Sequence, residues 1–127
     1  MVPLENKKFD LEKRTIKFSS EIIVFAKTLK KDATNIPLIS QLVRSATSIG
    51  ANYHEANGAS SKKDFRNKVY LCKKEARETK YWLEVIAKAN KESSDLARKL
   101  WQESHELTLI FSKILLTLEG NKTAKQF

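Results

Sequence analysis

The sequence of 127 residues contains few residues that interrupt regular secondary structure, with only two prolines and three glycines. Proline and glycine are the strongest breakers of helices, so long uninterrupted helices are favoured. Strand signals are also missing, because no stretch alternates apolar and polar residues between clusters of turn-forming residues. These absences argue against a β-rich fold and predict an all-α protein.

Cysteine and long apolar runs are equally scarce. Cys72 is the one cysteine, so no internal disulfide can form, and a reducing, cytoplasmic environment is expected. The N-terminal stretch MVPLENKKFDLEKR has no apolar run and therefore predicts no signal peptide. No stretch approaches the ~18 consecutive apolar residues that a membrane-spanning helix requires, so no membrane association is expected.

Apolar residues recur at spacings of three and four in four segments, which indicates amphipathic helices. The predicted helices span approximately residues 9–31, 36–57, 62–90 and 94–119, and the tail beyond Gly120 is expected to fray. Thr34 or Asn35 is expected to cap the second helix, and Ser61 the third. Because the helices are similar in length and the connections are short, we predict a single domain over residues 1–127, an antiparallel up-down-up-down four-helix bundle.

The stretch RSATSIGANYHEANG, residues 44–58, combines weak helix formers with a helical apolar stripe. Ala46 and Gly50 lie one turn apart on the same side, where small side chains allow another helix to approach. A glycine costs about 1 kcal/mol relative to alanine in a helix interior. Close packing against a neighbouring helix is a sufficient reason for Gly50, although a merely tolerated glycine is the alternative.

A polar row runs beside this stripe and consists of Arg44, Ser48, Asn52 and Glu55. The third predicted helix carries Glu75 and Glu78 beside its own apolar stripe. If the two helices pack antiparallel, Arg44 approaches one of these glutamates, and the spacing does not distinguish between them. Ordinary exposed side chains, each contributing little to stability, are the alternative interpretation.

Motifs for catalysis or for cofactor binding are missing. His54 and His105 fall on different predicted helices, and no Cys/His cluster has zinc-ligand spacing. The Glu-x-x-His pairs of di-iron bundles do not occur. Cys72 lies in the apolar stripe of the third helix, as a small core residue does. The sequence therefore predicts a protein that is not an enzyme and that has no metal site and no cofactor.

Positive charge is concentrated in the third predicted helix. The chain has 24 basic and 15 acidic residues, a net charge of +9, and ten basic against four acidic residues lie between Lys62 and Lys91. Five basic residues fall near one outward face: Lys63, Arg66, Lys73, Arg77 and Lys80. Such a face contacts phosphates without reading sequence, which predicts RNA or DNA as a partner. A solvated face that serves only solubility is the alternative.

Several aromatic and aliphatic residues lie partly outside the core stripes, more than a monomeric bundle is expected to bury. Aromatic residues are enriched in the cores of protein interfaces, so self-association is expected. The predicted interface residues are Tyr53, Tyr81, Trp82 and Trp101. Wide stripes that absorb these rings within one subunit are the alternative.

The runs LVRSATSIGANYHEA and SKKDFRNKVYLCKKEARETKYWLEVI resemble the four helix bundle proteins called 23S rRNA intervening sequence proteins. That family also includes the accessory variability proteins of diversity-generating retroelements. The similarity is dense from Leu42 to Ile86 and looser in the flanking helices. It implies a homopentameric ring of antiparallel four-helix bundles with no known catalytic activity. The positions that match the family's polar residues are Arg44, Ser48, Asn52 and Glu55, then Glu75, Glu78, Thr79 and Trp82.

Members of that family differ in their partners. Some are encoded within insertions in ribosomal RNA genes, and retroelement members bind a reverse transcriptase and nucleic acid through a basic surface. The expected role is therefore an oligomeric adaptor for nucleic acid or for a nucleic-acid-processing protein. A purely structural protein-interaction module is the alternative. The corner HEANGASS departs from the family's pattern, so its geometry is left open.

Overall fold

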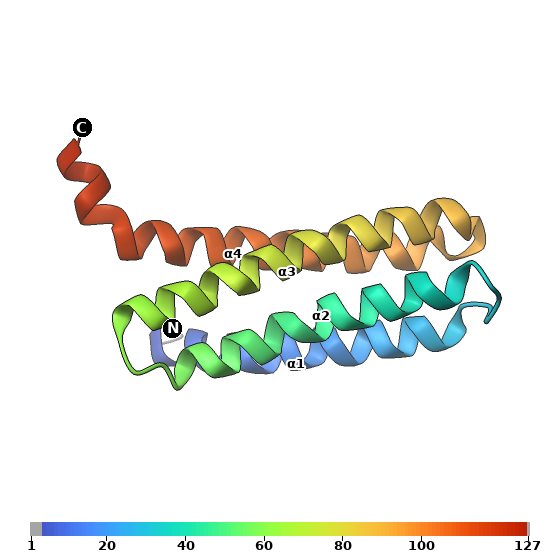
Figure 1. Cartoon of the computed structure of the whole chain (residues 1–127), viewed down its shortest axis with the longest axis horizontal. Coiled ribbons are helices and arrows are strands. Elements are labelled where there is room, and N and C mark those ends of the chain that lie inside the picture. Colours follow the sequence, from blue (N-terminus) through green and yellow to red (C-terminus); the bar gives the residue numbers. More distant parts are fainter. Residues whose placement is uncertain (1–3, 127) are drawn as a thin grey trace.

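The computed structural model describes the backbone of residues 4–126 and the side chains of residues 11–120. This part of the chain forms four long helices and no strand (Figure 1). The helices are α1 (Leu4–Thr28), α2 (Asn35–Asn57), α3 (Lys62–Ala89) and α4 (Ser94–Gln126), with a short 3-10 helix η1 (Lys91–Ser93) before α4. The all-α prediction is confirmed.

Helices that follow one another in the chain pack side by side and antiparallel (Figure 1). α2 packs against α1 and α3, and α3 packs against α4, whereas α1 and α4 touch sparsely. Within the described residues the backbones of α1 and α3 do not come close to each other, so these helices occupy diagonal corners of the bundle. This arrangement is the predicted up-down-up-down four-helix bundle.

The core is built from the apolar stripes that the sequence predicts. The largest fully buried apolar side chains are Phe18, Phe111, Ile22, Leu42, Ile49 and Leu83. Burial of a side chain of this size stabilises a fold by about 1.5–3 kcal/mol. The four stripes therefore supply the main driving force for assembly of the bundle.

Gly50 marks a close approach between α2 and α1. A Cβ atom at this position would lie 3.1 Å from both Cβ and Oγ1 of Thr15, which is buried on α1. Such a distance is shorter than an ordinary van der Waals contact. The close packing predicted for this stretch is confirmed, and α1 is the helix that approaches.

Three helix ends lie elsewhere than the periodicity predicts. α1 begins at Leu4 rather than near Phe9, because the intervening segment consists mainly of good helix formers. It ends at Thr28, since Lys31 folds back and donates from Nζ to the carbonyls of Ala26 (2.9 Å) and Leu29 (2.6 Å). α4 continues through Gln126, because Gly120 has no positive φ that would end a helix. The last turns of α4 bend away from the other helices (Figure 1).

Thr34, one of the two predicted alternatives, lies at the N-cap position of α2, but its side chain makes no capping hydrogen bond. Asp32 accepts hydrogen bonds at Oδ1 from the backbone N–H groups of Asn35 (2.8 Å) and Thr34 (3.1 Å), and these bonds lower the pKa of the Asp32 carboxyl. Asn35 instead forms a buried, reciprocal amide pair with Asn90, in which both N···O distances are 2.9 Å. This pair ties the α1–α2 turn to the end of α3.

The α2–α3 corner is short and regular. α2 ends at Asn57, and the amides of Gly58 and Ala59 donate to the carbonyls of Glu55 and Ala56. Ser61 then caps α3, accepting at Oγ from the backbone N–H of Asp64 (3.0 Å), as predicted. The unusual sequence of this corner therefore produces a compact turn.

Candidate nucleic-acid interface

One side of α3 is fixed by the core, and this decides which side faces solvent. The buried residues follow one another at spacings of three and four: Val69, Cys72, Ala76, Thr79, Leu83 and Ile86. Because a helix has 3.6 residues per turn, residues on the opposite side point away from the bundle. The basic residues of α3 are therefore displayed at the surface.

The structure brings the five predicted basic residues to neighbouring parts of that surface. Lys63 and Arg77 are exposed on the outward side of α3. The other three are half-buried. Two of them reach α4: Arg66 Nη1 lies 3.4 Å from Glu119 Oε1, and Lys80 Nζ lies 3.1 Å from His105 Nδ1. Lys63, Lys73 and Arg77 have no ion-pair partner among the described side chains.

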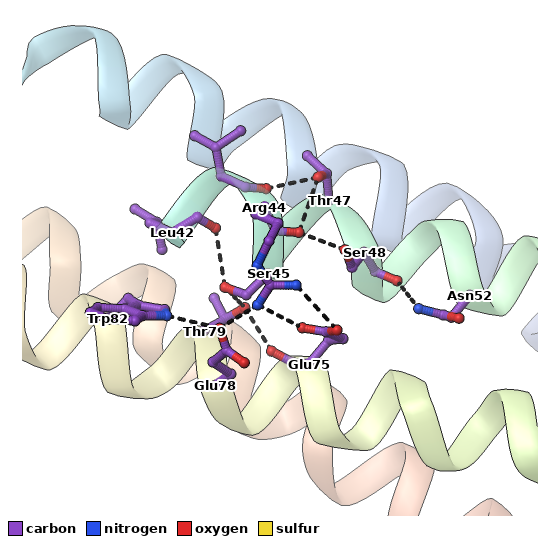
Figure 2. Close-up of polar contacts among 11 residues, drawn as sticks. Leu42, Arg44, Ser45, Thr47, Ser48, Asn52, Glu75, Glu78, Thr79 and Trp82 are labelled. Carbon is purple, nitrogen blue, oxygen red and sulfur yellow. Dashed lines mark hydrogen bonds and ion pairs between the residues drawn. The ribbon is translucent and has the colours of Figure 1, made fainter. Parts of the chain in front are cut away.

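Arg44 of α2 binds both glutamates that the sequence left as alternatives (Figure 2). Its Nη2 forms an ion pair with Glu78 Oε2 and lies 3.3 Å from Glu75 Oε1. Trp82 donates from Nε1 to the same Glu78 oxygen (3.0 Å). The hydrogen bond from Trp82, followed by that from Arg44, lowers the pKa of the Glu78 carboxyl. The hydrogen bond to Glu78 in turn contributes most to a raised pKa of Arg44.

The other residues of the predicted polar row do not join this cluster. Ser48 Oγ donates to the carbonyl of Arg44 (2.6 Å), and Asn52 Nδ2 donates to the carbonyl of Ser48 (2.8 Å), so both bond within α2 (Figure 2). Glu55 pairs with Lys68 of α3 at 2.9 Å. The hydrogen bond from Lys68 lowers the pKa of the Glu55 carboxyl.

A buried contact lies next to the Arg44 cluster and was missed as a pair by the sequence analysis. Thr79 Oγ1 donates to Ser45 Oγ at 2.9 Å, and both side chains are fully buried between α2 and α3 (Figure 2). The run of small residues around Ser45 is the sequence feature that could have indicated this hydrogen bond. Polar and apolar contacts thus hold α2 and α3 in one register.

Three of the four acidic residues of α3 have a partner on a neighbouring helix. Glu75 and Glu78 turn toward Arg44 on α2. Glu84 accepts a hydrogen bond at Oε2 from Trp101 Nε1 on α4 (3.2 Å). The outward side between these flanks keeps its positive charge largely uncompensated, which favours binding of anions.

The four predicted interface residues differ in how deeply they are buried within the subunit. Tyr53 is only 3% exposed and packs on Phe111 with ring centroids 6.0 Å apart. The prediction that Tyr53 contacts another subunit was wrong, because its ring is buried in the core of its own subunit. Trp82 and Trp101 are half-buried and pack against the core, whereas Tyr81 is 58% exposed.

Trp101 belongs to a small aromatic and cationic cluster between α3 and α4. Its ring stacks on His105 with centroids 5.1 Å apart and an angle of 15°. Lys80 Nζ lies 5.3 Å from the centre of the Trp101 ring, within the range of a cation–π contact. These contacts occupy much of the Trp101 surface within one subunit.

Two exposed residues of the outward side were not assigned to the basic face by the sequence analysis. Lys74 follows Lys73, and Tyr70 lies one turn before Lys74 with 61% of its surface exposed. The helical spacing that selected Arg66 and Arg77 also places these two residues on that side. Their spacing was therefore the signal that could have found them.

A second candidate surface lies on the α1–α4 side. A groove runs between the two helices, with Val24, Phe25, Leu96 and Leu100 as its apolar lining. Six polar residues complete its walls: Lys17, Ser20, Glu21, Thr28, Lys99 and Glu103. Beside it, Arg14 of α1 donates to both carboxylate oxygens of Glu103 on α4, at 2.7 and 2.8 Å, and to Glu106 at 3.0 Å. The contact with Glu103 contributes most to a raised pKa of Arg14. Apolar residues thus remain exposed where α1 meets α4.

Potential metal ligands and the single thiol were the remaining reactive groups to place in the structure. No group of three or more His, Cys, Asp or Glu side chains among them has the geometry of a metal site. Burial raises the pKa of the Cys72 thiol to about 12, which disfavours the reactive thiolate. No helix among the described residues combines the length and the hydrophobicity that crossing a membrane requires.

Comparison with known proteins identifies a matching family and a similar solved structure. The family described as 23S rRNA-intervening sequence protein matches residues 7–115. A crystal structure from Bacteroides thetaiotaomicron, of a protein with unknown function from the S23 ribosomal protein family, is similar with 32% sequence identity and a TM-score of 0.76. The similarity covers 82% of this chain and 96% of that one. No curated protein matches the chain.

Proposed function

The chain belongs to the 23S rRNA-intervening sequence protein family, and on that basis we propose that it is a non-enzymatic helical adaptor that binds nucleic acid through the outward side of α3. In this role it would bring RNA or DNA to a nucleic-acid-processing protein, such as a reverse transcriptase. The family description names a 23S rRNA intervening sequence, which supports RNA as the first polyanion to test.

One observation carries this proposal: the charges of α3 are sorted by side. Glu75 and Glu78 are held on the α2 flank by Arg44, while Lys73, Lys74 and Arg77 have no ion-pair partner among the described side chains. Lysines that serve only solubility need no such sorting. Uncompensated cations along one side of a helix attract the phosphates of a nucleic-acid backbone, and they give affinity without base specificity.

The proposal is tested by the salt dependence of RNA binding. Fluorescence anisotropy with a labelled RNA should show binding at ~50 mM salt that weakens at least about 10-fold by ~200 mM, because bound cations release condensed counterions. The triple variant Lys73→Gln, Lys74→Gln, Arg77→Gln should bind more weakly and should reduce the slope of log K against log salt by about 2 for a single strand.

A matched control removes the same number of charges from α1 and the turn that follows it. Lys13 and Lys27 are exposed on α1, the helix diagonal to α3, and Lys30 is exposed just beyond its end. Their replacement by Gln should leave the slope nearly unchanged. Equal effects of the two triple variants would show that net charge, rather than the α3 surface, governs binding, and no binding at low salt would refute the proposal.

Self-association is a second proposed activity, and it is supported by the α1–α4 groove. Val24 and Leu96 are exposed on either side of this groove although both are large apolar residues. Contiguous exposed apolar surface favours contact with another protein. The occupant we infer is a second copy of the chain, since the groove lies on α1 and α4 and leaves the outward side of α3 uncovered. A pentameric ring, as in the resembling family, is one closed arrangement that repeated contacts of this kind would produce.

A further inference from the structure

Two tyrosines lie within the cationic surface of α3. Tyr70 is 61% exposed and Tyr81 is 58% exposed. They are separated by three turns of helix, about 16 Å at ~1.5 Å per residue, so both fall on the outward side. Lys74 and Arg77 lie between them on the same side.

Neither tyrosine has an evident structural role. Among the described residues, neither hydroxyl group takes part in a hydrogen bond to another side chain, and neither ring belongs to the core. Tyr81 contacts the neighbouring Trp82 edge-on, with ring centroids 4.9 Å apart and an angle of 76°. A single exposed aromatic residue requires no explanation, but two that alternate with cations along one side of a helix form a pattern.

The surroundings of Tyr70 provide space for a planar group. Two adjacent surface hollows share Tyr70 and Lys73 as wall residues. The first also contains Lys74, Arg77 and Glu78, and the second extends to Leu116 and Glu119 on α4. Each of these carboxylates is already paired with an arginine, Glu78 with Arg44 and Glu119 with Arg66. A flat aromatic group could therefore lie against the tyrosine ring while an attached phosphate lies near two or three cations.

We propose that the α3 surface is a binding site for single-stranded nucleic acid, in which Tyr70 and Tyr81 stack on unpaired bases and the intervening cations bind the phosphates. This inference rests on the proposed function and adds the substrate class to it. Aromatic platforms within a positive surface are the recurrent means of binding single strands, because every base has a π-face.

A duplex would use this surface less well. Its bases are stacked on one another, so their faces are covered and only phosphates and groove edges remain accessible. The exposed side of a single helix such as α3 can then contact a duplex through Lys74 and Arg77 but gains nothing from the tyrosine rings. Preference for a single strand is therefore the measurable consequence of the two tyrosines.

The experiment measures fluorescence anisotropy of the full chain with three probes of equal length. The probes are an unstructured single-stranded RNA, the corresponding RNA duplex, and a strand of abasic nucleotides that keeps the phosphates. The wild type should bind the single strand on the order of 10-fold more tightly than the abasic strand, which has the same charge but nothing to stack. Tyr70→Leu with Tyr81→Leu should remove this difference, and Tyr70→Phe with Tyr81→Phe should retain it.

The outcomes separate this inference from the proposed function. Equal binding of all three probes by the wild type, or a single-strand preference that survives the leucine substitutions, would overturn the stacking site and leave a purely electrostatic surface. Binding of no probe would overturn both. The triple variant Lys73→Gln, Lys74→Gln, Arg77→Gln should weaken binding of all three probes alike, and Leu109→Ala, on an exposed apolar residue of α4, should alter none.

Discussion

At the scale of single residues, Gly50 shows how a position that looks poor for a helix can be optimal for a bundle. Replacement by Ala removes the helix-propensity cost of about 1 kcal/mol but introduces a Cβ atom 3.1 Å from Thr15. Overpacking of this kind costs about 1–3 kcal/mol, so we expect Gly50→Ala to lower the free energy of unfolding by about 1 kcal/mol. Urea denaturation followed by circular dichroism measures this change.

Gly120 is the matched control, because a Cβ atom there would meet nothing within 4 Å. Gly120→Ala should therefore leave stability unchanged or raise it slightly through helix propensity. If Gly50→Ala stabilises the protein as Gly120→Ala does, the close approach of α1 and α2 does not constrain the sequence at Gly50.

At the scale of helices, the Arg44 cluster links α2 and α3 in a manner that depends on pH. The hydrogen bond from Trp82 is the largest cause of a Glu78 pKa below the ordinary value of 4.5. The ionised carboxylate therefore stabilises the fold fully above pH 4.5, and this contribution is lost as the pH falls through the lower pKa of the folded state. At neutral pH, Glu78→Gln should lower the free energy of unfolding by about 0.5–1 kcal/mol, a modest value because Arg44 is nearly half exposed.

The difference between wild type and Glu78→Gln should shrink as the pH is lowered from 7 to below 4.5, since glutamine does not titrate. Thermal unfolding at a series of pH values measures the difference. Glu92→Gln, on an exposed glutamate without an ion-pair partner among the described residues, should show little difference at any pH. A pH-independent effect at Glu78 would mean that packing, rather than charge, holds this contact.

Whether a feature of this fold can be predicted from the sequence depends on whether neighbouring or distant residues determine it. The four helices and the outward side of α3 follow from the spacing of apolar residues along each segment, so both were predictable. The end of α1 depends on Lys31 folding back, and the α1–α2 turn depends on Asn35 meeting Asn90, which is 55 residues away. Periodicity contains no information about such contacts. For the same reason it could not show that Tyr53 packs on Phe111, or that one arginine serves two glutamates.

At the scale of the whole molecule, the α1–α4 groove predicts a particle larger than one chain. Light scattering at micromolar concentration should give a mass several times the 14.6 kDa of the monomer. Val24→Glu with Leu96→Glu should shift the mass toward the monomer without unfolding it, because both residues are already exposed in the single subunit. Leu109 is similarly exposed on α4 but does not line the groove, so Leu109→Glu should leave the mass unchanged. A wild-type mass of 14.6 kDa would refute self-association.

The diagonal placement of α1 and α3 has a consequence for how strongly an assembly would hold a long polymer. If copies join through α1 and α4, every α3 stays available, and a strand captured by one copy meets the next at a high effective concentration. Tight retention would then require only weak contacts at each copy. Short oligonucleotides that reach one copy would exchange rapidly, while long ones would dissociate only when all copies release them together.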